Sequence, residues 1–409
     1  MEFIADLHIH SKYSRATSET MNVEELARWA KLKGIALMGT GDFTHPLWFR
    51  ELKDKLTAST GGLYEYKGVN FILTCEVYNN FYVDGKAKRI HNIIFAPSLE
   101  VVERLNRKLQ EHGDLVSDGR PVLKLDAKDL VKICLDISSD CFIVPSHAWT
   151  PHFSIFGSNS GFDSVEECFG EETKNIHCLE TGLSSDPQMN WRLSKLDRYA
   201  LISNSDSHSP HRVGREANAL NCDLNYKQII DAIKSKDRKR FLYTIEFFPE
   251  EGKYHYDGHR NCKARVAPKD AIRNKNLCPI CGRKLTVGVM HRVEELADRP
   301  EGFIPDNAVP FKHMIPLDQI IADVRGVGEM AQSVEREYME IVSKCDNEFN
   351  VLLRMSEAEL KSQLPQKIAE GVIRVREGKV NILPGYDGEY GTIKIFGPEE
   401  IGEKQLTLF

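Results

Sequence analysis

Long apolar runs are missing from this 409-residue sequence. Its longest apolar stretches, such as 34–38 and 90–97, fall far short of the ~18 residues that a membrane-spanning helix needs. The first residues also lack the basic start and the apolar segment of a secretory signal. We therefore expect no membrane partner, a chain that begins at Met1, and a cytoplasmic location.

Cysteine is scarce as well, and low-complexity tracts and internal repeats are absent. Ten cysteines are too few for a disulfide framework, and only Cys278 and Cys281 have the spacing of metal ligands. Hydrophobic residues make up 41% of the chain and charged residues 28%, which is typical of a globular protein. At roughly 150 residues per domain, the length predicts two or three domains.

Positive charge is in deficit overall but concentrated in one segment. The formal net charge is −6, which by itself argues against a nucleic-acid partner. Residues 253–292, however, contain ten Lys or Arg against two Asp, a local charge of +8. A basic segment on an acidic body is typical of contact with a phosphate backbone, although a merely solvated basic face is an equal alternative.

Short β-rich runs alternate with helical stretches through about residue 245. The expected strands are 3–8, 35–40, 71–76, 91–95, 141–145, 176–179 and 201–203, and the expected helices are 23–33, 99–112, 127–135 and 226–235. This alternation predicts an α/β fold with parallel strands, arranged as a barrel or as a doubly wound sheet.

Metal-type side chains decide between these two folds. His8, Asp42, Glu76, His91, His147 and Asp206 each lie at or just past the end of an expected strand. Barrel enzymes carry their catalytic groups at the carboxyl ends of the strands, so the pattern favours a barrel. His8-x-His10 and Asp206-x-His208 each place two ligands on one side of the chain. Clustered metals of this kind suit hydrolysis of a phosphoester.

These motifs resemble the polymerase and histidinol phosphatase (PHP) superfamily, whose distorted barrel holds three metals. The resemblance implies that His8, His10, Glu76 and Asp206 bind the first metal, that Glu76, His91 and His147 bind the second, and that Asp42 and His208 contribute to the third. Phe43 stands where the superfamily usually has a histidine. An alternative for Ser205-Asp206-Ser207-His208 is a serine nucleophile, but no Gly-x-Ser-x-Gly turn surrounds either serine.

A second set of ligands lies in the basic segment. His259, Cys262, Cys278 and Cys281 have the spacing of a closed structural zinc site, which a segment too short for its own core requires. His255 could replace His259, and Cys262 could be a free thiol. Folding around zinc would display the interleaved basic residues, and we expect Lys263, Arg265 and Arg273 to contact DNA.

The C-terminal third has helical periodicity over 316–373, followed by a Gly-rich stretch over 377–397. Residues 324–331 resemble half of a helix-hairpin-helix element, although an ordinary glycine turn is the favoured alternative. The last residues, with Gln405, Leu406, Leu408 and Phe409, resemble the peptide that docks into a sliding clamp, either the bacterial β clamp or archaeal PCNA. Packing of this tail on the protein is the alternative.

The combination resembles the endonuclease Q family. That resemblance implies a nucleoid-associated DNA repair enzyme that cuts 5′ to deaminated bases (uracil, hypoxanthine, xanthine) and abasic sites, with Glu76 and Asp206 catalytic and two to three Zn, Mg or Mn ions besides one structural Zn. We expect a barrel over 1–249, a zinc module over 250–300, a mainly helical domain over 301–396 and a tail over 397–409.

Aromatics beside the ligands are candidate base contacts, Trp149 first among them, with core packing as the alternative. A phosphoesterase of small metabolites and a non-catalytic DNA-binding protein remain rival functions.

Overall fold

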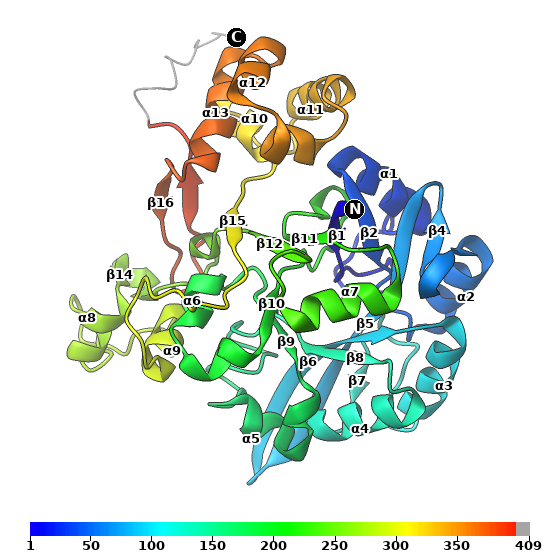
Figure 1. Cartoon of the computed structure of the whole chain (residues 1–409). Helices are drawn as coiled ribbons and strands as arrows, with labels where there is room; N and C mark the ends of the chain where they lie inside the picture. The colour runs from blue at the N-terminus through cyan, green and yellow to red at the C-terminus, as the bar shows by residue number, and fades with distance from the viewer. Residues whose placement is uncertain (398–409) are drawn as a thin grey trace.

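The computed structural model describes residues 1–397, and the last twelve residues, 398–409, lie outside this part. Its centre is a mixed sheet of eleven strands in the order β15-β12-β11-β1-β2-β5-β4-β3, with β6 and β7 paired to β5 and β8 paired to β6 (Figure 1). The strands of this sheet are β1 (Glu2–Asp6), β2 (Ile35–Gly39), β3 (Thr57–Ala58), β4 (Tyr64–Tyr66), β5 (Val69–Val83), β6 (Lys86–Ala96), β7 (Val122–Leu123), β8 (Phe142–Pro145), β11 (Ala217–Asn221), β12 (Phe241–Glu246) and β15 (Phe311–His313). Three strand pairs lie outside it: β9 (Cys178–Glu180) with β10 (Ala200–Ile202), β13 (Asp257–His259) with β14 (Ala264–Val266), and β16 (Asn381–Leu383) with β17 (Thr392–Lys394).

Parallel pairing holds for only part of this sheet. β1, β2 and β5 pair in parallel, as expected, but β5 and β6 form a long antiparallel hairpin, and β6–β8, β1–β11 and β11–β12 are antiparallel too. The expectation of parallel strands throughout was therefore wrong. Asp84 and Gly85 both have positive φ, 51° and 75°, in the two-residue turn that closes the hairpin. Asp-Gly is a strong hairpin signal, and no crossover helix separates the two strands.

Helices α1, α3, α4 and α7 and the C-terminal helices α10 to α13 lie where the periodicity indicated helix, whereas α2, α5, α6, α8 and α9 were not expected. They are α1 (Val23–Lys33), α2 (Pro46–Lys55), α3 (Leu99–Leu109), α4 (Ala127–Ile137), α5 (Val165–Phe169), α6 (Pro187–Trp191), α7 (Tyr226–Ser235), α8 (Pro268–Arg273), α9 (Val289–Leu296), α10 (Leu317–Arg325), α11 (Gln332–Lys344), α12 (Glu357–Gln363) and α13 (Gln366–Arg376), with a π-helical turn at Asn350–Arg354. Local capping explains their starts. The side chains of Asn22, Ser98 and Asn225 each accept an N–H from the first turn of α1, α3 and α7.

One core cluster lies within the strand arrangement. It joins buried residues of nine strands, namely β1, β2, β5, β6, β8, β9, β10, β11 and β12, to the apolar side of α7. Leu7, Ile93 and Ile202, for example, are fully buried in this single cluster. Strands from distant parts of the chain thus bury their side chains in one shared core, as the strands of a barrel do.

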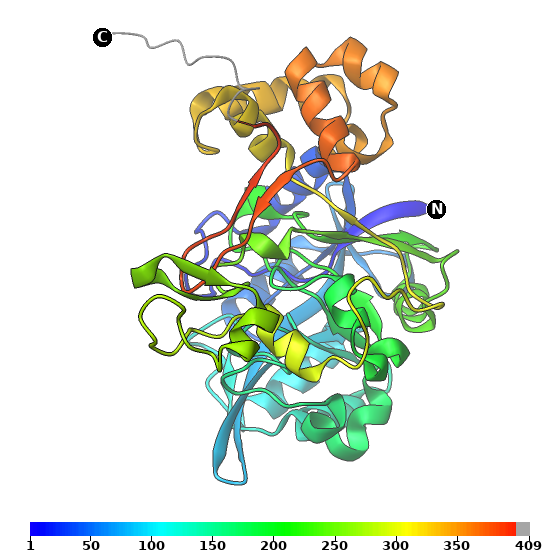
Figure 2. The same cartoon turned by 90° about the vertical axis from the view of Figure 1, so that its left-hand side faces the viewer.

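The C-terminal helices form a unit at one end of the molecule (Figures 1 and 2). Strands β16 and β17 run from these helices to the segment that contains β13, β14, α8 and α9. There the backbone N–H of Tyr256 donates to the Gly385 carbonyl, and that of Gly388 donates to the Lys253 carbonyl. The side chain of Asp387 accepts bonds from Arg260 N–H and the Thr286 hydroxyl. The C-terminal strands therefore bind the cysteine-containing segment to the rest of the chain.

Within residues 1–397, no helix is both long and apolar enough to span a bilayer.

Candidate metal centre

Glu76 is the middle of the metal-type cluster. It lies within β5, its side chain is fully buried, and its two oxygens face two different sets of ligands. Oε1 lies 3.0 Å from His91 Nδ1 and 3.0 Å from His147 Nε2. Oε2 lies 3.4 Å from His10 Nε2 and 3.7 Å from His8 Nε2. One carboxylate can thus bridge two ions.

The first set contains His8, His10, Glu76 and Asp206, whose ligand atoms all lie within 4.8 Å of one another. Asp206 Oδ1 is 3.0 Å from His10 Nε2 and 3.8 Å from His8 Nε2. Both Nε2 atoms and this Oδ1 are buried without a geometrically good hydrogen-bond partner. Buried polar atoms without a partner are costly, so their convergence fits a bound cation.

The second set contains Glu76, His91 and His147 and meets the same distance criterion. His91 lies on the adjacent antiparallel strand β6, and His147 follows β8. The grouping therefore brings together three strands, and it agrees with the two ligand sets that the superfamily resemblance implied.

Hydrogen bonds from the other ring nitrogens orient these histidines. His8 Nδ1 lies 3.0 Å from Glu180 Oε1, and His10 Nδ1 lies 3.0 Å from Asp42 Oδ1. His147 Nδ1 lies 2.7 Å from the Thr150 hydroxyl. Each arrangement leaves Nε2 for a metal, and the contacts of His8 and His10 follow the usual carboxylate–histidine–metal pattern.

Glu180 is a functional residue that sequence reasoning missed. Besides His8, its carboxylate accepts bonds from the backbone N–H of His147 at 2.8 Å and from the Asn204 side chain at 2.8 Å. It thereby ties together the loops that carry His8, His147 and Asp206. Glu180 directly follows the expected strand 176–179, so the strand-end rule that selected the other ligands also points to it.

Asp42 and His208 do not join a metal-binding group among residues 1–397. Asp42 instead accepts bonds from the Ser11 backbone N–H at 2.6 Å and from the hydroxyls of Ser11 and Ser14 at 2.7 and 2.8 Å. His208 Nδ1 lies 2.9 Å from the Asp206 carbonyl. The structure thus places Asp42 behind His10, and its assignment to a third metal stays a prediction.

Electrostatics keep the centre charged. Burial opposes protonation of His8, but Glu180 and other carboxylates raise its pKa well above the ordinary value. Burial would raise the pKa of Asp206, but the neighbouring imidazoles hold it well below its usual range. Burial lowers the pKa of His91 to about 4. Ionised carboxylates and a His91 that is neutral near pH 7 are ready to bind a cation, whereas a protonated His8 must release its Nε2 proton when an ion binds.

Strained backbone marks the same loops. Asp42, His147 and Asp206 all have positive φ, at 46°, 29° and 46°, which is uncommon for residues other than glycine. Gly41, at φ 61°, is required where it stands, because a Cβ there would lie 2.3 Å from the Ile9 carbonyl oxygen. These bends turn His147 and Asp206 toward the ligand groups around Glu76 and place Asp42 behind His10.

The cysteine segment assembles a second, separate group. The ligand atoms of His259, Cys262, Cys278 and Cys281 lie within 4.8 Å of one another, and His259 Nδ1 is 3.3 Å from Cys281 Sγ. His255, the alternative ligand, is buried and absent from this group. Although desolvation opposes it, backbone N–H groups of the Cys-x-x-Cys turn lower the pKa of Cys278 to about 6, which favours a thiolate.

Basic side chains cover the surface of this segment. Eight of the ten are exposed: Lys253, Arg260, Lys263, Lys269, Arg273, Lys275, Arg283 and Lys284. Arg265 is half-buried, with its guanidinium 4.9 Å from the centre of the Tyr386 ring. Lys263 and Arg273 are therefore the freer of the three expected DNA contacts.

Trp149 is a core residue. It is 1% exposed, donates its indole N–H to Asn190 and packs against Phe156. This burial contradicts the expectation that Trp149 contacts DNA. Near the metal centre, Phe153 is only half-buried, has φ 64° and stacks on His91 with ring centres 5.0 Å apart.

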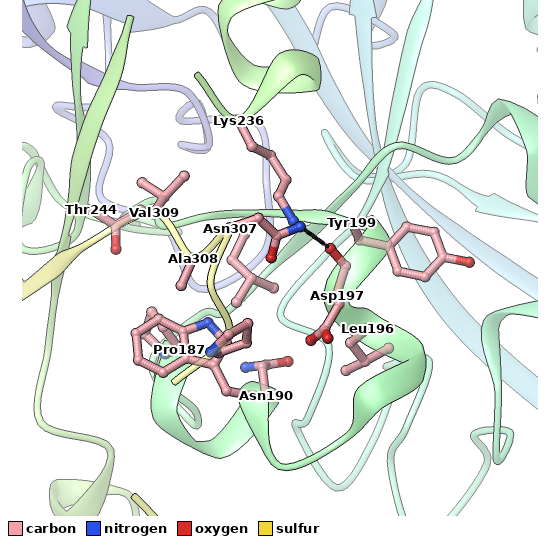
Figure 3. A pocket seen from close by; sticks show the side chains of 13 residues that line it. Pro187, Asn190, Leu196, Asp197, Tyr199, Lys236, Thr244, Asn307, Ala308 and Val309 are labelled. Carbon is pink, nitrogen blue, oxygen red and sulfur yellow. Dashed lines mark hydrogen bonds between the residues drawn. The ribbon is translucent and has the colours of Figure 1, made fainter. Parts of the chain in front are cut away.

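Neither a serine nucleophile beside Asp206 nor the cavity in Figure 3 is supported as an alternative active site. Ser205 and Ser207 are fully buried, and the Ser207 hydroxyl donates to the Ser209 carbonyl, so neither fits a nucleophile that substrate must reach. The cavity in Figure 3, lined by Pro187, Leu196 and Val309 among others, measures only about 20 Å³ and contains none of the clustered ligands. It has room for a water molecule but not for a substrate.

Gln405, Leu406, Leu408 and Phe409 lie outside the described residues. Gly326 ends α10 in the left-handed conformation, as in an ordinary helix-ending glycine turn.

The sheet carries two adjoining groups of histidines and carboxylates, partly within strands and partly in the loops that follow them, and these groups have the composition of a divalent-metal centre. Comparisons with known proteins make the class specific. A family model, the MJ0043 C-terminal domain, matches residues 316–379. Protein MJ0043 of Methanocaldococcus jannaschii is 35% identical over 265 residues, which are 62% of the chain but 32% of the relative, so the chain spans about a third of that relative's length.

Two solved structures match the whole chain. The lesion-specific endonuclease PfuEndoQ from Pyrococcus furiosus has a TM-score of 0.88 at 32% identity, covering 99% of this chain and 98% of its own. An endonuclease Q in complex with a 27-mer duplex substrate that has an abasic lesion at the active site has a TM-score of 0.86 at 33% identity, covering 100% of both chains. The chain belongs to the endonuclease Q family, and it is an endonuclease.

Proposed function

We propose that the protein is a DNA repair endonuclease that hydrolyses the phosphodiester 5′ to deaminated bases and abasic sites. The convergence of His8, His10 and Asp206 on Glu76, with three buried polar atoms unpaired, carries this proposal. A relative of equal length binds duplex DNA with an abasic lesion at its active site. The choice of uracil, hypoxanthine and xanthine rests on the family resemblance.

The ligand atoms fit divalent ions. Imidazole nitrogens together with carboxylate oxygens suit Zn²⁺ and Mn²⁺, and the carboxylates also suit Mg²⁺. We propose one ion at His8, His10, Glu76 and Asp206 and another at Glu76, His91 and His147, with a third at Asp42 and His208 as the remaining possibility. Such ions would polarise a phosphoryl oxygen and generate hydroxide near neutral pH.

The chain's own residues position the reaction. Glu76, held in β5, contributes one oxygen to each ligand set. Glu180 orients the ring of His8 and accepts a bond from the backbone N–H of His147. Asp206 is 24% exposed, whereas Glu76 and His10 are fully buried. Asp206 therefore lies on the side of the centre from which substrate approaches, and it can both bind an ion and meet the phosphate.

We divide the chain into a distorted PHP-type barrel over 1–249, a zinc module over 250–300, a mainly helical domain over 301–396 and a tail. The third part also contributes β15 to the sheet of the first, since β15 pairs with β12. The single core that nine strands share supports the barrel. The four convergent ligands in the cysteine segment support one structural Zn. The basic surface of that module supports a role in DNA contact.

Cleavage of a defined duplex tests this function. An end-labelled oligonucleotide with one uracil, hypoxanthine, xanthine or abasic site is incubated with full-length protein and Mg²⁺ or Mn²⁺, beside the undamaged duplex. We expect one cut, 5′ to the lesion, and none in the control. Asp206→Asn and Glu76→Gln should abolish the cut while DNA binding persists. Hydrolysis of small phosphate monoesters without any DNA cleavage would contradict the proposal, and binding without cleavage would favour the non-catalytic alternative.

We further propose that Gln405, Leu406, Leu408 and Phe409 dock into the host's sliding clamp, the bacterial β clamp or PCNA. Three closely spaced apolar side chains after Gln405 resemble a clamp-docking peptide and favour a partner pocket, and tethering raises the local concentration of enzyme at DNA where clamp is loaded. Deleting 405–409 should abolish clamp binding in a direct titration and leave oligonucleotide cleavage intact. Lost cleavage would instead indicate that the tail packs on the enzyme.

A further inference from the structure

Arg120 lies at the mouth of the metal centre and has no role in the ligand sets described above. Its Nη1 is 3.1 Å from Glu76 Oε2. The Arg120 side chain is 24% exposed, whereas that of Glu76 is fully buried. Among the acids and histidines expected as ligands of this centre, only Asp206 and His208 are comparably open, at 24% and 31%. The guanidinium therefore lies between the buried ligands and the substrate side.

The loop that carries Arg120 is built against the metal centre. The backbone N–H of Gly119 donates to the Tyr13 carbonyl at 3.0 Å, and the Gly119 carbonyl accepts from the Thr44 hydroxyl at 3.1 Å. A Cβ at Gly119 would lie 2.4 Å from Asp42 Oδ2. Glycine thus lets the loop backbone approach the carboxylate that orients His10, and this contact fixes where Arg120 projects.

The Glu76 oxygen that Arg120 contacts is also a candidate metal ligand. Glu76 Oε2 is the same atom that faces His10 Nε2 and His8 Nε2 in the first ligand set. A divalent ion and a guanidinium on one oxygen would be a few Å apart and would repel each other. When an ion occupies the first set, Arg120 needs another anion within reach of the mouth, and the scissile phosphate supplies one.

We propose that Arg120 is a catalytic residue that exchanges Glu76 Oε2 for the non-bridging oxygens of the scissile phosphate. The planar guanidinium can donate two parallel bonds to a phosphate, and such bonds strengthen as negative charge develops on the oxygens in the transition state. Arg120 moves no proton and forms no covalent bond. This inference rests on the proposed phosphodiester hydrolysis and names the group that recognises its phosphate.

The test measures metal affinity and cleavage separately on the full-length chain. In Arg120→Ala, calorimetric titration with Mn²⁺ in the absence of DNA should show about tenfold tighter binding, because one competing positive charge is gone. Turnover on lesion duplex should fall about 10²- to 10³-fold, as when a charge-stabilising donor is removed. In Arg120→Lys, which keeps the charge without the two-pronged geometry, metal affinity should stay near wild type and turnover should fall at least tenfold.

Tighter Mn²⁺ binding together with slower turnover distinguishes this role from a structural one, because a structural defect would lower both metal affinity and turnover. Arg28→Ala on α1, an exposed arginine paired with Glu25, is the matched control and should change neither. Turnover of Arg120→Ala within twofold of wild type, or weaker Mn²⁺ binding, would overturn the inference. If Arg120→Ala fails to fold, Arg120→Lys decides by the same two readouts. Failure of the wild-type protein to cut any lesion duplex would instead refute the proposed function.

Discussion

Each histidine of the first ligand set can offer only one ring nitrogen to a metal, so the partner of the other nitrogen decides how well the ligand is presented. Asp42 has this role for His10, since its Oδ1 faces Nδ1 at 3.0 Å while Ser11 and Ser14 saturate its Oδ2. Glu180 has the same role for His8. Both carboxylates are fixed on the side of the imidazoles away from Glu76.

Asp42→Asn should therefore weaken the binding of metal about 10- to 100-fold and leave the number of bound active-site ions unchanged. The reason is that an amide is a poorer acceptor for His10 Nδ1–H than a carboxylate, while no ligand atom is lost. Calorimetric titration gives the affinity, and elemental analysis of the loaded protein gives the stoichiometry. Asp54→Asn, an exposed aspartate on α2, is the control. One bound ion fewer would restore Asp42 as the ligand of a third metal.

Sequence patterns selected residues that the structure brings together, but they did not show how these residues contact one another. The two groups contain the histidines and acids that were expected near strand ends, although Glu76 and His91 lie within long strands. The contact between Asp42 and His10 was not visible in the sequence, because a carboxylate looks the same there whether it faces a metal or a histidine. Glu180 was findable by its position, whereas the burial of Trp149 depended on packing against Phe156 from farther along the chain.

At the scale of elements, turns proved harder to foresee than the strands and helices themselves. The expected strands 71–76 and 91–95 are only the inner ends of β5 and β6, which continue to the turn at Asp84 and Gly85. In the outer half of the hairpin, Asn79 and Asn80 interrupt the apolar residues of β5, and Lys88 and Arg89 precede those of β6. Val77, Phe81 and Ile90 are nevertheless buried in the core there, so the sequence pattern marked only the uninterrupted part of each strand.

The cysteine segment depends on its ligands rather than on a core. Its own apolar cluster contains only Ala264, Ala271, Cys278 and Leu285 as buried members. The double variant Cys278→Ser/Cys281→Ser should release one zinc per chain and increase hydrogen exchange across residues 250–300, because structural zinc contributes folding free energy directly. Atomic absorption and hydrogen-exchange mass spectrometry measure the two effects.

Cys222→Ser, a cysteine outside the ligand group, controls for the loss of a thiol and should retain the zinc. Equal zinc content in the double variant and the wild type would contradict the assignment.

At the scale of the whole molecule, a buried ion pair joins the C-terminal helices to the sheet domain. Lys33, at the end of α1, lies 2.7 Å from Glu348 Oε2, and both side chains are almost completely buried. Glu348 also accepts the Tyr338 hydroxyl at 2.8 Å and the Leu317 backbone N–H at 3.0 Å. One carboxylate therefore holds α1, α10 and α11 together.

Glu348→Ala should lower the free energy of unfolding by about 3–5 kcal/mol, because it leaves the Lys33 ammonium buried without a partner. Chemical denaturation of the full-length chain measures this loss. Lys361→Ala, which removes an exposed ion pair with Glu357 on the same helical unit, should change stability by less than about 1 kcal/mol. Equal effects of the two substitutions would mean that the buried pair does not hold the domains together.

Charge separation over the whole molecule determines how it should respond to salt. The exposed basic side chains of residues 253–284 cover one module of a chain whose net charge is −6, so we expect this surface to make most of the electrostatic contact with the DNA backbone outside the metal centre. DNA affinity should fall steeply with salt, and Lys263→Gln/Arg273→Gln should reduce the slope of log K against log salt by about 0.9 per lost contact, or about 1.8 in all. Neutralising Arg265 as well should add less, because its guanidinium is held on the Tyr386 ring.

The matched control, Lys53→Gln/Lys67→Gln, removes two exposed lysines near α2 and β4, which lie on the opposite side of the molecule from α8 and β14 (Figure 1). Fluorescence anisotropy at a series of salt concentrations gives both slopes. Equal slopes for the test pair and the control pair would mean that the basic module is solvated in the complex and that DNA lies elsewhere.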